Sequence, residues 1–171
     1  AAIRIALAIV SMAAHRHRRV LVRVLPGNHG PDPSPWLARV IHHAYAADDR
    51  VEVDTSPGLF WFFEWGATLL AATHGHTCKP ADLPMITAES MPQAWGRTQY
   101  RRGIMGHYHK ETRSPGKMLV RILPAVTARD AYAASRGYYA DRGMIALTFD
   151  RQRGPCGEVA RYLPAPTMEA A

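Results

Sequence analysis

The sequence predicts one layered α/β or α+β domain rather than a helical bundle, because helical patterns come early in the chain and strand patterns dominate later. The length of 171 residues fits a single domain of ordinary size. A hydrophobic fraction of 47% with 20% charged residues excludes a disordered or collagen-like chain. We expect the domain to cover residues 1–164 and residues 165–171 to form a frayed tail.

Two helices are expected in the first third of the chain. Ile3, Leu7 and Val10 recur at helical spacing in the apolar stretch that opens the sequence. Positive charge follows this stretch instead of preceding it, which argues against a secretory signal. Ser34 and Pro35 suit the start of a second helix, with serine as the N-cap and proline at the first helical position.

Strand patterns recur from residue 20 to the end of the chain, as short β-branched or apolar runs bounded by turn residues. The expected strands cover residues 20–25, 51–53, 59–65, 67–72, 104–105, 118–123, 144–149 and 159–163. Residues 77–99 are predicted to form a loop and an irregular helix, and residues 130–135 another helix. The aromatic run 59–65 fits a core strand better than a surface on which nucleic-acid bases stack.

Five of the nine histidines stand just after expected strand ends, in turns that contain glycine. They are His29, His74, His76, His107 and His109. Ligands of open α/β sheets bind at strand ends, and glycine lets the backbone approach a ligand closely. Because imidazole is the commonest metal ligand of proteins, this ordered set predicts a metal or catalytic site.

The three histidine motifs resemble the last three motifs of the calcineurin-like metallophosphoesterases. They are Pro-Gly-Asn-His at 26–29, Thr-His-Gly-His at 73–76 and Gly-His-Tyr-His at 106–109, in the family's order and strand context. The resemblance implies a β-sandwich of two packed sheets flanked by helices, with two divalent metals at the strand ends. Mixed nitrogen and oxygen ligands would suit Mn, Fe, Zn or Ni.

The resemblance also implies a role for each residue of these motifs. Asn28, His74 and His107 would bind the second metal, and His109 the first. His29 would face the phosphate and stabilise or protonate the leaving oxygen. His76 would contact the substrate or support a ligand.

The sequence departs from the family pattern upstream of these motifs. The family's Asp-x-His and Gly-Asp motifs are absent, since no Asp or Glu precedes Asp32. We therefore expect a domain that lacks the N-terminal strands of the fold and is a truncated or split part of a longer protein. Gly30 stands where the family usually has a carboxylate, and Asp32 is the candidate to replace it.

Charge indicates an anionic partner without identifying it. The net charge is +7, the pI is near 9.8, and 18 of the 21 cations are arginines. Arginine suits phosphate, although a GC-rich genome also enriches it. Arg97 and Arg101 precede the last histidine motif and are either near the substrate phosphate or in a solvated loop.

Three functions remain open: a metal-dependent phosphodiesterase or nuclease of phage type, a non-catalytic module that binds nucleic acid, and a remnant that works only with a partner chain or as a homo-oligomer. We favour the hydrolase, with doubtful activity for this chain alone. Two cysteines, Cys78 and Cys156, are too few for a disulfide framework, and whether they pair stays open. This low cysteine count fits a reducing compartment, so we expect a cytoplasmic protein. No apolar run reaches the ~18 residues of a membrane helix.

Overall fold

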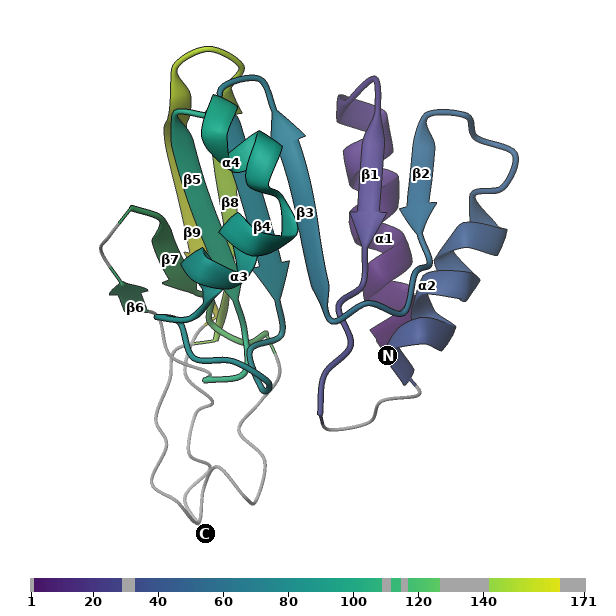
Figure 1. The fold of residues 1–171 in the computed structure, drawn as a ribbon. Coiled ribbons are helices and arrows are strands. Elements are labelled where there is room, and N and C mark those ends of the chain that lie inside the picture. Colours follow the sequence, from purple (N-terminus) through teal and green to yellow (C-terminus); the bar gives the residue numbers. More distant parts are fainter. Residues whose placement is uncertain (1, 29–32, 109–111, 115–116, 127–141, 164–171) are drawn as a thin grey trace, which may run out of the picture. The chain divides into compact units, whose positions relative to one another are not determined.

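The computed structural model describes residues 2–28, 33–108, 112–114, 117–126 and 142–163 (Figure 1). The chain divides into two compact units, Ala1–Trp61 and Phe62–Ala171. The fold is of the mixed α/β class, as the sequence predicts. Within the described residues, no helix has both the length and the apolar character needed to cross a membrane.

The first unit contains a β-α-β arrangement preceded by a helix. Helix α1 (Ala2–Arg16) leads into β1 (Val20–Arg23), and α2 (Pro33–Ala44) connects β1 to β2 (Val51–Asp54). The two strands pair in parallel, so the connecting helix has to cross over from the end of one to the start of the other. Both helices and both strands confirm the elements predicted for this part of the sequence.

The first unit is held together by one buried stripe on each helix and by one buried arginine. Val10 and Ala14 on α1 are buried, as are Ala38 and Ile41 on α2. The guanidinium of Arg23, with only 5% of its side chain exposed, donates to the Asp54 carboxylate at 3.0 Å. This pair connects the ends of β1 and β2.

A five-stranded sheet and a hairpin make up most of the second unit. The sheet has the order β3-β4-β5-β7-β6, in which β4, β5 and β7 are parallel and β6 is antiparallel to β7. The sheet strands are β3 (Phe60–Trp65), β4 (Thr68–Thr73), β5 (Tyr100–Met105), β6 (Thr112–Ser114) and β7 (Leu119–Ile122). Strands β8 (Gly143–Asp150) and β9 (Gly154–Tyr162) form a separate antiparallel hairpin.

The two faces of this sheet are covered by different elements. Helices α3 (Leu83–Ser90) and α4 (Pro92–Arg97) connect β4 to β5 and lie over one face, while the hairpin lies over the other (Figure 1). Side chains alternate between the faces. Gly103 packs against Leu83 on the helix side, and on the hairpin side Arg121 of β7 pairs with Glu158 of β9.

Several element boundaries differ from the sequence prediction. Strand β5 begins four residues before the predicted start at Ile104, because Tyr100, Arg101 and Arg102 pair with β4 although they are not an apolar run. Residues 77–99 contain two helices rather than one. Strand β6 was not predicted, since three residues carry no periodicity. The helix predicted at 130–135 and the tail at 165–171 lie outside the described residues, and the single domain over 1–164 stays a prediction.

Candidate functional site

Three histidines of the second unit gather at one edge of the sheet. Strands β4 and β5 are parallel with Thr73 opposite Met105, so their carboxyl ends lie side by side. His74 and His76 follow β4, and His107 follows β5. The ring centroid of His74 lies 5.4 Å from that of His76 and 5.3 Å from that of His107, and the centroids of His76 and His107 are 6.4 Å apart.

The backbone after each strand bends sharply to bring these rings together. The amide of Gly106 donates to the carbonyl of His74 at 3.1 Å, which carries the pairing one residue past both strands. Gly75 then adopts a φ of +99°, and His107 a φ of +62°. A positive φ is unusual for a residue other than glycine, and residues of this kind cluster at functional sites.

One ring nitrogen in the cluster has an unmet hydrogen-bonding need. The Nδ1 atom of His76 is buried and has no hydrogen-bond partner within the described residues. Leaving a buried polar atom unpaired costs about 1–3 kcal/mol. A metal ion, a water molecule or a substrate oxygen at this position would remove that cost.

The spacing of the rings fits a pair of imidazole ligands better than a complete metal site. A metal–nitrogen bond of ~2.1 Å places the ring centres of two ligating histidines about 5 Å apart. The His74–His76 and His74–His107 separations are close to this value. In the described part of the chain, however, no group of three or more His, Cys, Asp or Glu side chains is arranged to hold a metal ion. These histidines therefore fit a metal as partial ligands that need further donors.

Cys78 lies close in sequence to this cluster but is a poor additional ligand. Burial, followed by the negative charge of Asp82, raises the pKa of the Cys78 thiol. Only the thiolate is a strong metal ligand or nucleophile. The thiol form is therefore favoured, and Cys78 and Cys156 are both free.

The structure does not determine the positions of the remaining predicted Asn, Asp and His site residues relative to this cluster. Asn28 is exposed and belongs to the first unit, where it follows β1. His29, Asp32 and His109 lie outside the described residues. Their assignment to a metal or a substrate stays a prediction.

Arg97 and Arg101 make contacts within the protein, far from the histidines. Arg97 donates through Nε and Nη2 to the two carboxylate oxygens of Glu64, at 2.8 and 2.5 Å. This pairing lowers the pKa of Glu64. Arg101 donates to the carbonyls of Trp95 and Thr98, at 2.5 and 2.8 Å.

Strand direction explains why these two arginines do not reach the histidines. Arg101 is the second residue of β5, whereas His107 follows the last. The five or six residues of extended chain between Arg101 and His107 place the two residues roughly 15–20 Å apart. The structure therefore does not bring Arg97 and Arg101 to the candidate site, and it gives both arginines a role in attaching α4 to the sheet.

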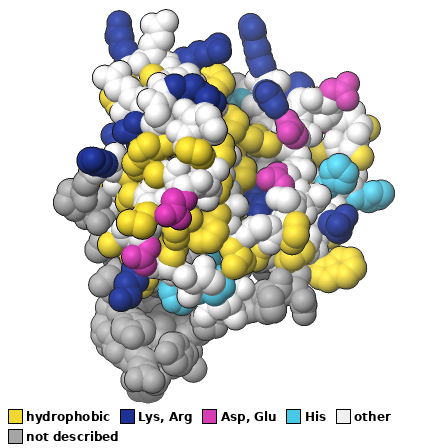
Figure 2. Space-filling view, in the orientation of Figure 1, with side chains coloured by type: hydrophobic (Ala, Val, Ile, Leu, Met, Phe, Trp, Pro, Cys, Tyr) yellow, Lys and Arg dark blue, Asp and Glu magenta, His cyan; other side chains and the backbone are white. Residues whose placement is uncertain are grey.

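Some of the arginines are paired with carboxylates of the same chain. Five arginines of the described residues form ion pairs: Arg19 with Glu52, Arg23 with Asp54, Arg50 with Asp48, Arg97 with Glu64, and Arg121 with Glu158. Figure 2 shows Lys and Arg side chains at several separate places on the face that it presents. These five arginines are therefore less available to a nucleic acid than unpaired arginines would be.

The comparisons with known proteins do not assign this chain to a family. No protein-family model matches the chain, and neither the curated proteins nor the solved structures contain a significant match. The evidence for function is therefore the order of the histidine motifs and the geometry of the histidine cluster.

Proposed function

We propose that this chain is a calcineurin-like metallophosphoesterase domain with a layered β-sandwich flanked by helices, which hydrolyses phosphate esters at a dinuclear metal centre. The observation that supports this most is the meeting of His74, His76 and His107 where parallel strands β4 and β5 end. Two motifs separated by 33 residues are brought together there. A chance occurrence of histidines in surface loops would not require this convergence.

The residues of the motifs divide into binding and proton-transfer roles in this proposal. His74 and His107 would hold one metal with the side-chain oxygen of Asn28, and His109 would hold the other. Metal ions at such a centre polarise the phosphoryl oxygens and supply a hydroxide at neutral pH. His29 would protonate the leaving oxygen, with Asp32 orienting its ring.

His76 has a different role, because it is the ring with a buried and unpaired nitrogen. We place its Nδ1 toward a phosphate oxygen or toward a water molecule bound in the site. A protonated Nδ1 would donate to that oxygen and a neutral one would accept from water. Either contact would fix the orientation of the substrate relative to His74 and His107.

The ligand set of the first metal is incomplete in this sequence. No carboxylate precedes Asp32, and a bridging carboxylate normally holds the two metals together in the family. We therefore expect weak hydrolysis by this chain alone, and stronger hydrolysis where a partner or another segment supplies the carboxylates.

Hydrolysis of bis(p-nitrophenyl) phosphate in the presence of Mn²⁺, Ni²⁺ or Zn²⁺ tests the proposal. We expect a slow, metal-dependent release of nitrophenolate that disappears in His74→Ala and in His107→Ala. His43→Ala is the matched control, because His43 is exposed in the last turn of α2. Hydrolysis that survives both site substitutions, or that needs no added metal, would contradict the proposal.

The second candidate is a nucleic-acid-binding module, which the pI near 9.8 favours. Its signature is binding of single- or double-stranded DNA or RNA in EDTA, with an affinity that falls steeply as salt rises. The dispersed and paired arginines make this the weaker candidate. Equal nucleic-acid binding by wild type and His74→Ala, with no hydrolysis by either, would favour it over the hydrolase.

A further inference from the structure

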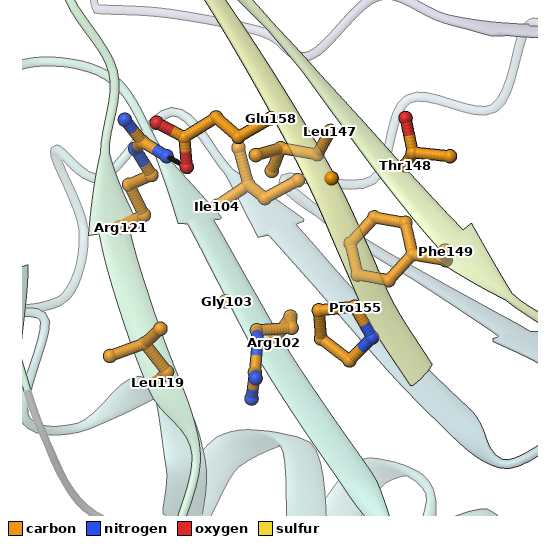
Figure 3. A pocket seen from close by; sticks show the side chains of 11 residues that line it. Arg102, Gly103, Ile104, Leu119, Arg121, Leu147, Thr148, Phe149, Pro155 and Glu158 are labelled. Carbon is orange, nitrogen blue, oxygen red and sulfur yellow. Dashed lines mark hydrogen bonds and ion pairs between the residues drawn. The ribbon is translucent and has the colours of Figure 1, made fainter. Parts of the chain in front are cut away.

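A cavity lies between the two β-layers of the second unit, away from the histidines. Its volume is about 320 Å³, and β5 and β7 form one wall while β8 and β9 form the other (Figure 3). This volume is at the lower end of the range for small-molecule sites. The apolar part of the lining consists of Ile104, Leu119, Leu147, Phe149 and Pro155.

Arg102 is the polar group of this cavity whose charge is not balanced. Its guanidinium has five N–H donors, and Nη1 donates to the carbonyl of Arg101 at 2.9 Å. No carboxylate among the described residues pairs with it. Burial lowers the pKa of Arg102, with no opposing charge to offset the effect.

Arg121, in the same wall, is an arginine whose charge is balanced by a carboxylate. It pairs with Glu158 from the opposite wall, and Figure 3 shows this pair at one end of the cavity with Arg102 at the other. The two arginines lie on the same face of the sheet, yet only one of them has a carboxylate of the hairpin opposite it. A half-buried guanidinium with free donors is a ready binding group for an incoming carboxylate.

We propose that this cavity binds a small carboxylic acid with a flat aromatic body, whose carboxylate pairs with Arg102 while its ring packs against Phe149, Leu147 and Pro155. A single guanidinium fork matches the single charge and the two oxygens of a carboxylate. A phosphate dianion would need more donors, and the carboxylate of Glu158 disfavours a second negative charge in the cavity. A flat aromatic body can stack on the ring of Phe149 in the lining.

This site is separate from the candidate metal centre. Arg102 and Ile104 point to the hairpin side of the sheet, whereas Gly103 packs against Leu83 on the helix side. The histidines follow the strands at their carboxyl ends. The proposal therefore does not depend on the phosphoesterase assignment, and binding should persist in EDTA.

A titration of the whole chain with 2-naphthoate in EDTA tests the proposal, with binding measured by calorimetry and by protein NMR. We expect saturable binding with shifts confined to the methyl and ring signals of Leu147, Phe149 and Ile104. Arg102→Met keeps an apolar stem but removes the fork, and we expect it to weaken binding about tenfold or more. Arg161→Met is the matched control, because Arg161 is exposed on β9 outside the cavity lining and should leave the affinity unchanged.

Naphthalene-2-carboxamide, which has the same shape without the charge, provides a test that needs no variant. Wild type should bind it at least tenfold more weakly than 2-naphthoate, even if Arg102→Met fails to fold. Three results would overturn the proposal: no binding of 2-naphthoate at millimolar concentration, equal affinity for the acid and the amide, or shifts that map outside the cavity.

Discussion

Gly103 is the position where the packing between β5, β7 and α3 leaves no room for a side chain. A Cβ atom added there would lie 2.8 Å from Cδ2 of Leu83, and 2.9 and 3.3 Å from the two γ-methyl groups of Val120. Leu83 is 0% exposed and Val120 1%, so neither can move into solvent. Gly103→Ala therefore forces two fixed, fully buried side chains apart.

The expected loss of stability follows from two opposing terms. Overpacking of a core costs about 1–3 kcal/mol. Alanine also restricts the unfolded chain relative to glycine, which returns about 0.5–1 kcal/mol. We expect Gly103→Ala to lower the free energy of unfolding by about 1–2 kcal/mol, measured by urea denaturation with circular dichroism.

A double-mutant cycle with Leu83→Ala assigns this cost to the clash with α3. Leu83→Ala alone should cost about 2–5 kcal/mol. The combined variant should cost less than the sum, because the new methyl group occupies space that Leu83 has left. Gly96→Ala is the control: nothing lies within 4 Å of its added Cβ, and alanine should stabilise α4 slightly. A fully stable Gly103→Ala, or additive costs in the cycle, would refute the packing described here.

Two further predictions concern charge. The Ser56 hydroxyl donates to Asp54 and, with Arg23, lowers the pKa of the Asp54 carboxyl in the folded protein. The stability that these contacts contribute is therefore present above the unfolded Asp pKa of about 3.9 and is lost as pH falls toward the pKa of folded Asp54. Asp54→Asn should therefore flatten the acid limb of stability against pH, and parallel curves for the two proteins would contradict this account. Glu158→Gln should lower the free energy of unfolding by about 1–3 kcal/mol, because it removes the countercharge of the Arg121 guanidinium, whose side chain is 6% exposed. Arg121→Met should cost less, because a lone Glu158 can turn to water. The reverse order in urea denaturation would show that the ion pair does not connect sheet and hairpin in this way.

Elements with their own periodicity could be predicted from the sequence. Helix α1 carries Val10 and Ala14 on one buried stripe. Helix α2 begins at Pro33, so Ser34 and Pro35 lie in its first turn and Ser34 is not its N-cap, but the pair still indicates the start of the helix closely. The sequence pattern predicts only residues 104–105 of β5, because Arg101 and Arg102 resemble loop residues. The pairing of Arg101 with Leu69 of β4, which no local pattern indicates, places it in the strand.

The sequence indicates the histidine turns of the candidate site but not the cavity beside Arg102. The glycine–histidine turns after β4 and β5 are local patterns, and the parallel pairing of the two strands places these turns side by side. The cavity beside Arg102 could not be predicted in this way. Its lining comes from four strands, and no local pattern indicates which arginine will face a carboxylate and which will not.

The central claim is that His74, His76 and His107 form part of a metal centre, and metal content tests it most directly. The purified chain would be equilibrated with Mn²⁺, Fe²⁺, Zn²⁺ or Ni²⁺, freed of excess metal by gel filtration, and measured by elemental mass spectrometry. Wild type would be compared with His74→Ala/His107→Ala and with the control His42→Ala/His43→Ala, whose histidines are exposed on α2. We predict near-stoichiometric metal in wild type and control and its loss from the site variant, whereas equal metal in all three proteins, or none in any, would contradict the claim.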